Sequence, residues 1–138
     1  GSAVRQLKIN FVSPLELMKR FAAQRDLSEG CVINFLDQRI EKVDREGGMY
    51  PLSKKVLAEA TRQAAVQWAP RIRVNGVAPG PVLPPRDRPE WTMAKSVAST
   101  PLKRAVSVED VVSACVFLIE NESVTGHIVH VDCGQHLG

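Results

Sequence analysis

A helix, a strand and a turn follow one another between residues 50 and 81, and this unit most constrains the fold. Apolar and small residues recur at three- and four-residue steps from Lys55 to Trp68, which predicts an amphipathic helix. Ala69-Pro70 ends the helix, because the residue before a proline is pushed out of helical conformations. Residues 71–78 then alternate like a β-strand before becoming apolar, and a Pro-Gly-Pro turn follows. We interpret the three segments as one supersecondary unit.

Tyr50 and Lys54 stand four residues apart where this helix begins, so the two side chains share one helix face. A phenol with a pKa near ~10 is a poor acid at neutral pH, but a neighbouring cation stabilises the phenolate and lowers that pKa. Such a tyrosine could give a proton to a developing oxyanion or amide anion. A Tyr–Lys pair is also common on exposed helix faces, so the flanking sequence must support the catalytic interpretation.

The flanking sequence resembles the short-chain dehydrogenase/reductases. The matching parts are Tyr50-x-x-x-Lys54, the phrase from Ala69 to Val82, and the ending from Val124 to Gln135, and together they cover nearly the whole chain. The resemblance implies an α/β fold: the second half of a Rossmann-like, doubly wound sheet, with three roughly parallel strands and right-handed helical crossovers. We expect residues 1–138 to form one partial domain.

A complete enzyme of that family begins with a strand, a glycine-rich turn and a helix whose N-terminus holds the pyrophosphate. Nothing before Asn10 supplies such a segment, and the glycines at 47–48 and 76–80 have the wrong spacing. We therefore expect this chain to be the C-terminal half of such a protein, without the N-terminal βαβ nucleotide-binding half. On that interpretation it is inactive alone.

Asp37 is the main departure from the family pattern. It follows a short apolar run, residues 31–36, that predicts a buried strand. Most of the family carries a serine here, thirteen residues before the tyrosine, to hydrogen-bond the substrate carbonyl. A carboxylate only accepts hydrogen bonds and repels an oxyanion, so it suits a substrate with N–H donors or one protonated on nitrogen. The chain is similar in this respect to pteridine and dihydromonapterin reductases; the alternative is an aspartate that caps a turn.

Residues 4–25 predict a helix with an apolar stripe, kinked or broken at Pro14. Asn10 matches the family's asparagine, which helps to hold a water that links the catalytic lysine to solvent. Without the resemblance, Asn10 is only a polar residue beside a kink. The resemblance makes Tyr50 the proton donor, Lys54 its pKa modifier and ribose anchor, and Asp37 the group that orients the substrate.

Other residues gain expected roles from the same resemblance. Pro79, Gly80 and Val82 match the turn over the nicotinamide carboxamide. Pro84 stands where the family often has a threonine that contacts the pyrophosphate, so that contact is in doubt. Residues 83–106 correspond to the variable substrate loop, often a mobile lid. There Trp91 and Met93 would pack against a flat heteroaromatic ring, or alternatively plug into the core.

The last helix should begin at the N-cap Ser107, and its apolar surface predicts that it is buried. A short strand over residues 127–132 follows. His127, His130 and His136 do not share metal-site spacing on one face, so no metal is expected. Three widely spaced cysteines are expected to be free thiols of a cytoplasmic protein.

The formal charge of +3 is small, and the basic residues are scattered among acids, which argues against nucleic acid as a partner. No apolar run approaches ~20 residues and no signal peptide opens the chain, which argues against a membrane partner. The resulting hypothesis is an oxidoreductase that uses NADPH, with NADH as the alternative, to reduce a C=N or C=O bond of a small, pteridine-like molecule. It would form a dimer or tetramer.

The second hypothesis is a non-catalytic relative or stable fragment that serves as an oligomerisation module. It rests on the helices at residues 4–25 and 50–69, which resemble those that pair across a twofold axis in the family.

Overall fold

The computed structural model describes residues 1–83 and 90–138, without the side chains of residues 90–92. In this part of the chain, three strands form one parallel sheet in the order β1 (Gly30–Phe35), β2 (Ile72–Pro79) and β3 (Ile128–Val131). Gly30 pairs with Ile72 at one end of β1, and Gly76 pairs with Ile128 where β3 joins. The predicted α/β class and the three parallel strands are therefore confirmed.

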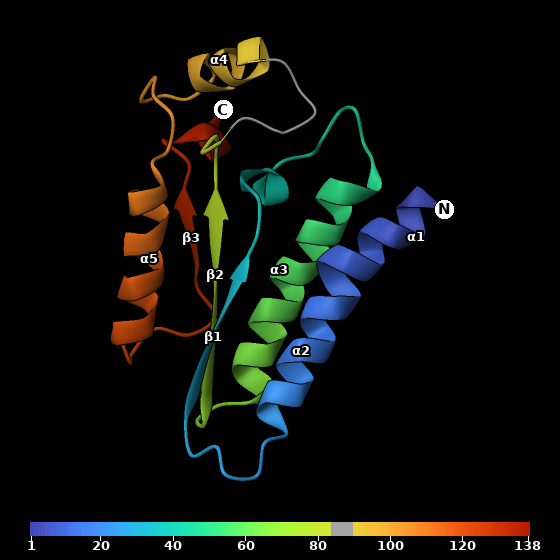
Figure 1. Ribbon diagram of the computed structural model, residues 1–138, viewed down its shortest axis with the longest axis vertical. Coiled ribbons are helices and arrows are strands. Elements are labelled where there is room, and N and C mark those ends of the chain that lie inside the picture. Colours follow the sequence, from blue (N-terminus) through green and yellow to red (C-terminus); the bar gives the residue numbers. More distant parts are fainter. Residues whose placement is uncertain (84–89) are drawn as a thin grey trace.

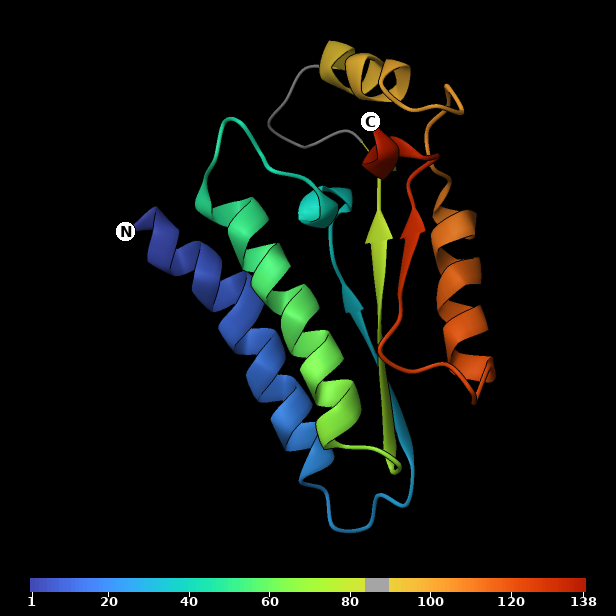
Figure 2. The ribbon, with the colours of Figure 1, turned by 180° about the vertical axis from the view of Figure 1, so that it is seen from behind.

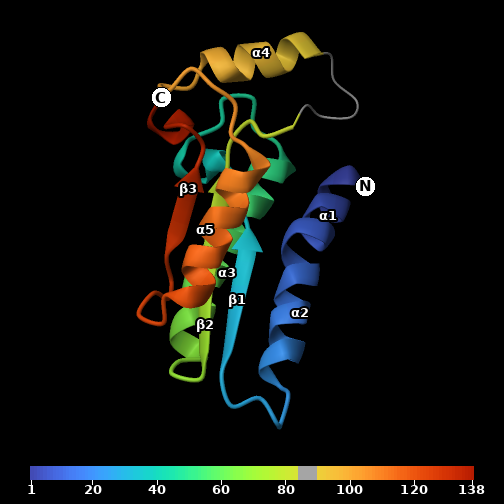
Figure 3. The ribbon, with the colours of Figure 1, turned by 60° about the vertical axis from the view of Figure 1, so that its left-hand side comes forward.

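Helices cover both faces of this sheet (Figure 1). On one face, α1 (Ser2–Leu7), the π-helical turn η1 (Lys8–Val12) and α2 (Ser13–Ala22) run on as one rod beside α3 (Met49–Gln67). The opposite face carries α5 (Val108–Glu120), as the view from behind also shows (Figure 2). The helix α4 (Glu90–Ala98) lies across the carboxyl ends of the strands (Figure 3).

The predicted break at Pro14 is present as the π-helical turn just before it. Pro14 has no N–H to donate to the carbonyl of Asn10, so the ordinary i to i−4 ladder cannot continue there. The wider turn lets the rod continue without that hydrogen bond. Asn10 therefore lies on an irregular turn that faces α3.

Small side chains let α3 lie close to the sheet. Ala58, Ala64 and Ala65 are buried against β2, whose Ile72 and Val74 are also buried. Burial of such apolar surface contributes about 25 cal/mol per Å² to stability. This packing fixes the direction of α3 and so places its N-terminal end beside the carboxyl end of β1.

The prediction that the last helix is buried is wrong. Leu118 is the buried residue of α5, whereas five of its large apolar side chains are at least 42% exposed: Val108, Val112, Val116, Phe117 and Ile119. The physical reason is the width of the sheet, since three strands can cover only one face of the helix. The N-cap prediction is confirmed, because Ser107 Oγ accepts a hydrogen bond from the Asp110 N–H at 3.0 Å.

The carboxyl ends of the strands meet at one edge of the sheet, where the predicted site residues Asp37 and Gly80 lie together with Asp132, which was not predicted as a site residue. Asp37 comes after β1, Gly80 after β2 and Asp132 after β3. The Gly80 N–H donates to Val131 O at 3.0 Å, and a Cβ on Gly80 would lie 2.8 Å from the Asp132 backbone. Only glycine allows the two loops to approach this closely.

Among the described helices, none is both long enough and apolar enough to cross a membrane.

Candidate active site

Asp37 follows the β1 strand, which ends at Phe35, and caps the 3-10 turn η2 (Gln38–Glu41). Its Oδ1 accepts hydrogen bonds from the Arg39 backbone N–H at 2.8 Å and from Arg39 Nε at 3.2 Å. The alternative prediction, that Asp37 caps a turn, is therefore confirmed, but the cap uses only one of the two carboxylate oxygens. The other oxygen, Oδ2, points toward the first turn of α3.

Tyr50 meets that second oxygen. Its Oη lies 3.5 Å from Asp37 Oδ2, a long hydrogen bond across thirteen residues of sequence. Gly48, with φ 105°, turns the chain into α3, and Pro51 lies in the first helical turn, where its missing N–H removes no helical bond. The guanidinium of Arg39 stands 5.2 Å from the centre of the Tyr50 ring.

Burial is the main reason that the pKa of Tyr50 is raised above its usual value of 10.0. The charge of Asp37 raises this pKa further, and the nearby Arg39 charge opposes the change. The expected lowering of this pKa by Lys54 is therefore absent from this structure. The cation that stabilises the phenolate here is Arg39, which the sequence analysis missed. At neutral pH the phenol keeps its proton.

Lys54 lies one turn further along α3. Its Nζ donates to the Phe35 carbonyl at the end of β1 at 2.9 Å and stands 5.9 Å from the centre of the Tyr50 ring. Burial lowers the pKa of Lys54 from its usual 10.5, while the Asp37 carboxylate opposes that change. An ammonium has three N–H groups, so two remain for other acceptors after the Phe35 bond.

Asn10 reaches the same helix from η1. Its Nδ2 donates to Gln6 Oε1 at 2.8 Å and to Ser53 Oγ at 3.2 Å, and Ser53 Oγ donates to the Tyr50 carbonyl at 2.7 Å. Ser53 is fully buried and was missed as a site residue. Its position directly before Lys54 in the sequence was the signal that could have identified it as a site residue. This chain of hydrogen bonds ties the π-helical turn to the first turn of α3.

The structure thus brings together the four residues expected to be catalytic, Asp37, Tyr50, Lys54 and Asn10, around the first turn of α3. The expected cofactor-binding turn, with Pro79, Gly80 and Val82, follows β2 at the same edge of the sheet. An open pocket reaches Tyr50 from outside and is lined by the following residues: Ser2, Ala3, Gln6, Arg39, Asp44, Glu46, Gly47, Gly48, Met49, Tyr50 and Pro51.

Besides Asp37, two residues were expected to bind substrate, Trp91 and Met93, and both lie on α4, across the strand ends. Met93 is half-buried, whereas the side chain of Trp91 is outside the described part of the chain. Pro84 falls in the stretch 84–89, also outside the described residues.

Comparison with known proteins gives one family and several relatives. A family described as enoyl-(acyl carrier protein) reductase matches residues 2–136. Protein FixR of Bradyrhizobium diazoefficiens is 33% identical over 97% of this chain and 49% of its own length. Pteridine reductase 1 of Leishmania tarentolae is 31% identical over 93% of this chain and 48% of its own. The chain spans about half the length of these curated relatives.

A solved structure has the same fold. FolM alternative dihydrofolate reductase 1 from Brucella suis, in complex with NADP, superposes with a TM-score of 0.88 at 35% identity. The match covers 99% of this chain and 56% of that one.

Proposed function

The chain belongs to the short-chain dehydrogenase/reductase family, and we propose that it is the substrate-side half of an NADPH-dependent reductase of pteridine-like molecules. The observation that carries the proposal is the pairing of Asp37 with Tyr50, whose oxygens lie 3.5 Å apart. It sets a hydrogen-bond acceptor beside a protonated phenol. Ketone reduction gains nothing from that acceptor, whereas a pterin offers an amino group and ring nitrogens to it.

The residues present fit a nicotinamide dinucleotide. Lys54 projects its ammonium at the carboxyl end of β1, and its two remaining N–H groups suit the neighbouring hydroxyls of a ribose. The turn after β2 lies at the same edge of the sheet and packs against the β3 loop at Gly80. NADPH would supply a hydride for the carbon of the C=N or C=O bond, with NADH as the alternative. The choice of NADPH is supported by the NADP complex of the FolM relative.

Side chains of this chain would then orient the substrate and donate the proton. Asp37 would accept hydrogen bonds from N–H groups of the substrate and so fix which face of the substrate ring lies toward the nicotinamide. Tyr50 Oη–H would donate its proton to the nitrogen or oxygen that gains the negative charge. Burial keeps that proton on Tyr50 at neutral pH, since the pKa of the phenol is raised. Arg39 would stabilise the resulting phenolate. Asn10 would hold the first turn of α3 in place through Ser53.

The experiment is NADPH oxidation by the whole protein with a dihydropterin as substrate. Tyr50→Phe should lower kcat by about 10²–10⁴-fold, the usual contribution of a positioned proton donor. The isolated 138-residue chain should be inactive. Rapid dihydropterin reduction by this chain alone, or by Tyr50→Phe, would contradict the proposal.

Assembly is a second candidate function, favoured by apolar side chains on the outer faces of the helices. Leu17 on α2 and Val66 on α3 are 68% and 81% exposed, and Leu52 and Val56 on α3 are also exposed. We propose that these helices pair between copies of the chain in a cytoplasmic homo-oligomer. Light scattering of the wild type and of Val66→Lys tests this, and a cofactor titration of the whole protein separates an enzyme from a non-catalytic relative.

A further inference from the structure

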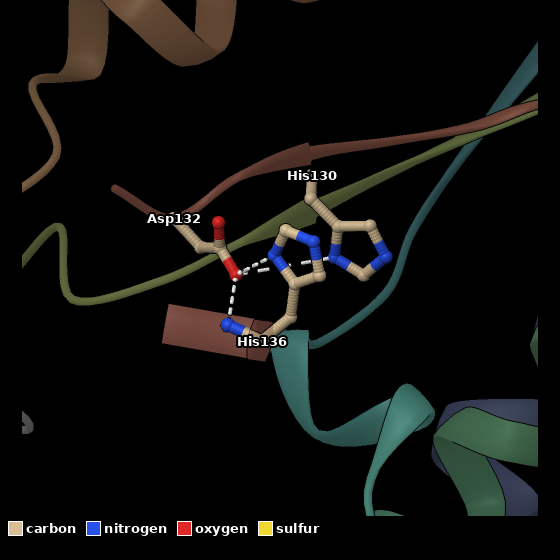
Figure 4. Close-up of side chains that lie close together, drawn as sticks. All are labelled: His130, Asp132 and His136. Carbon is tan, nitrogen blue, oxygen red and sulfur yellow. Dashed lines mark hydrogen bonds and ion pairs between the residues drawn. The ribbon is translucent and has the colours of Figure 1, made fainter. Parts of the chain in front are cut away.

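A second cluster of polar side chains lies at the carboxyl end of β3, and it consists of His130, Asp132 and His136 (Figure 4). His136 Nδ1 is 2.8 Å from Asp132 Oδ2, and His130 Nδ1 is 4.0 Å from the same oxygen. The two imidazole rings are stacked with their centres 4.0 Å apart and 14° between their planes. One potential ligand atom from each residue lies within 4.8 Å of the others.

A reversal of the chain after β3 assembles the cluster. His130 and Asp132 are two residues apart, so an extended strand directs both side chains to one side. Gly134, with φ 83°, then turns the chain into the 3-10 helix η3 (Gln135–Leu137). Asp132 holds the turn, since Oδ1 accepts from the Gly134 N–H at 3.1 Å and Oδ2 from the His136 N–H at 2.8 Å. His136 is thereby returned onto His130.

His130 is held in a form that can bind a cation. Its Nε2 lies 3.4 Å from Glu41 Oε1, so the ring can donate its proton to that carboxylate and keep Nδ1 as a bare acceptor. Within the described residues, the buried Nδ1 has no hydrogen-bond partner. A buried nitrogen without a partner is costly, and a carboxylate behind the opposite ring nitrogen is the usual support of a metal-binding histidine.

We propose that His130 Nδ1, His136 Nδ1 and Asp132 Oδ2 bind a divalent transition metal of the zinc class. The metal would replace the proton of the hydrogen bond between His136 Nδ1 and Asp132 Oδ2 and release it to solvent. Ligand atoms about 2.0–2.2 Å from a tetrahedral zinc are about 3.3–3.6 Å apart, and the observed separations of 2.8 and 4.0 Å bracket that value. One ring must rotate about its Cβ–Cγ bond to aim both nitrogens at a common point, because the rings are nearly parallel. Two nitrogens and one oxygen suit zinc, cobalt or nickel better than calcium or magnesium.

The metal would be structural and would take no part in reduction. It would join β3 to η3, and through Glu41 it would brace η2, the turn that Asp37 caps. Binding to the folded chain alone stabilises it by mass action. This proposal replaces the expectation of no metal. That expectation considered the three histidines on one strand face, whereas Asp132 and the turn at Gly134 complete the cluster.

The test is titration of the 138-residue chain, purified with a chelator, with Zn²⁺ by calorimetry and with Co²⁺ by visible absorption. One site per chain is expected, and a hundredfold excess over Kd should raise Tm by about 5–10 °C. His136→Gln and His130→Gln should each weaken binding by more than about 100-fold, since even a supporting partner is worth about 10–100-fold. Glu41→Gln should weaken it by about tenfold.

His127→Gln is the matched control, because it also removes an imidazole but leaves the cluster intact. It should bind Zn²⁺ as the wild type does. X-ray absorption of the zinc-loaded wild type needs no variant and should show two imidazole nitrogens and oxygen. Sulfur ligands in that spectrum, absence of binding below about millimolar Zn²⁺, or equal weakening by His127→Gln and His136→Gln would each overturn the proposal.

Discussion

Tyr50 Oη and Asp37 Oδ2 lie 3.5 Å apart, although Tyr50 is in the first turn of α3 and Asp37 is in the loop after β1. Burial and then the Asp37 carboxylate raise the pKa of the phenol, so the phenol keeps its proton at neutral pH.

Asp37→Ser should change substrate preference in the whole protein. A serine hydroxyl can donate to a carbonyl oxygen, whereas the aspartate can only accept N–H donors at neutral pH. We expect kcat/KM for a dihydropterin to fall by about tenfold or more, since a lost hydrogen bond to a charged group is worth about 1.5–3 kcal/mol. Reduction of a simple ketone should be unchanged or faster. Equal dihydropterin turnover in both proteins would remove Asp37 from the proposed role.

The ionisation of Tyr50 can be measured directly, because it is the only tyrosine in the sequence. Absorbance at alkaline pH should give a pKa above 10.0 for the folded chain. Asp37→Asn should lower this pKa, because both the charge and the hydrogen bond of Asp37 favour the neutral phenol. Arg39→Ala should raise it, because the guanidinium stabilises the phenolate. A lower pKa in Arg39→Ala would contradict the assignment of Arg39 as the stabilising cation.

The same shift predicts how stability depends on pH. The folded-state pKa of Tyr50 is raised, so its contribution is fully present below the unfolded value of about 10. That contribution should be lost as the pH rises through the folded-state pKa. Denaturant unfolding above pH 10 should therefore show a steeper loss of stability in the wild type than in Tyr50→Phe. Parallel pH profiles for the two proteins would refute this. Lys54 is common to both and cancels in the comparison.

Cys133 and Gly134 offer a paired test of backbone strain. Cys133 has φ 55°, a left-handed conformation that costs a non-glycine residue about 1 kcal/mol or more. Cys133→Gly should therefore raise the free energy of unfolding by up to about 1 kcal/mol. Gly134→Ala should lower it by more than about 1 kcal/mol, because φ is 83° and the new Cβ would lie 2.9 Å from Pro101 Cγ. Urea denaturation measures both, and a stabilising Gly134→Ala would contradict a left-handed conformation at this residue.

Arg73 should be important for stability without affecting chemistry. Its guanidinium donates to the Leu118 and Ile119 carbonyls at 2.8 Å each, and to the Val124 carbonyl at 3.0 Å. These bonds satisfy the C-terminal end of α5, whose carbonyls lack helical partners. Arg73→Ala should lower the free energy of unfolding by about 1–3 kcal/mol. Arg104→Ala is the control, because the Arg104 guanidinium donates to no helix-end carbonyl within the described residues. Equal losses of unfolding free energy in both variants would count against the capping role of Arg73.

Sequence patterns were sufficient for much of the fold. The three- and four-residue periodicity of α3, the Ala69-Pro70 stop and the alternation of β2 are local features, and each predicted its element. The break at Pro14 and the cap at Ser107 were predicted for the same reason, since each depends on one residue and its immediate neighbours. The shared site of Asp37 and Tyr50 was expected from the resemblance to the family, in which a side chain thirteen residues before the tyrosine binds the substrate.

Tertiary structure decided what depends on contacts between distant segments. Burial and the neighbours of Tyr50 set the direction of its pKa shift. Burial and Asp37 raise this pKa and Arg39 opposes them, whereas the sequence had predicted a lowering by Lys54. The exposure of α5 followed from the width of the sheet, which the apolar pattern of one helix does not contain. The turn at Gly134 brought His136 back onto His130, which strand spacing could not predict. Local sequence determined the elements of this protein, whereas charge and burial at its sites depend on packing, because both are sums over groups far apart in the chain.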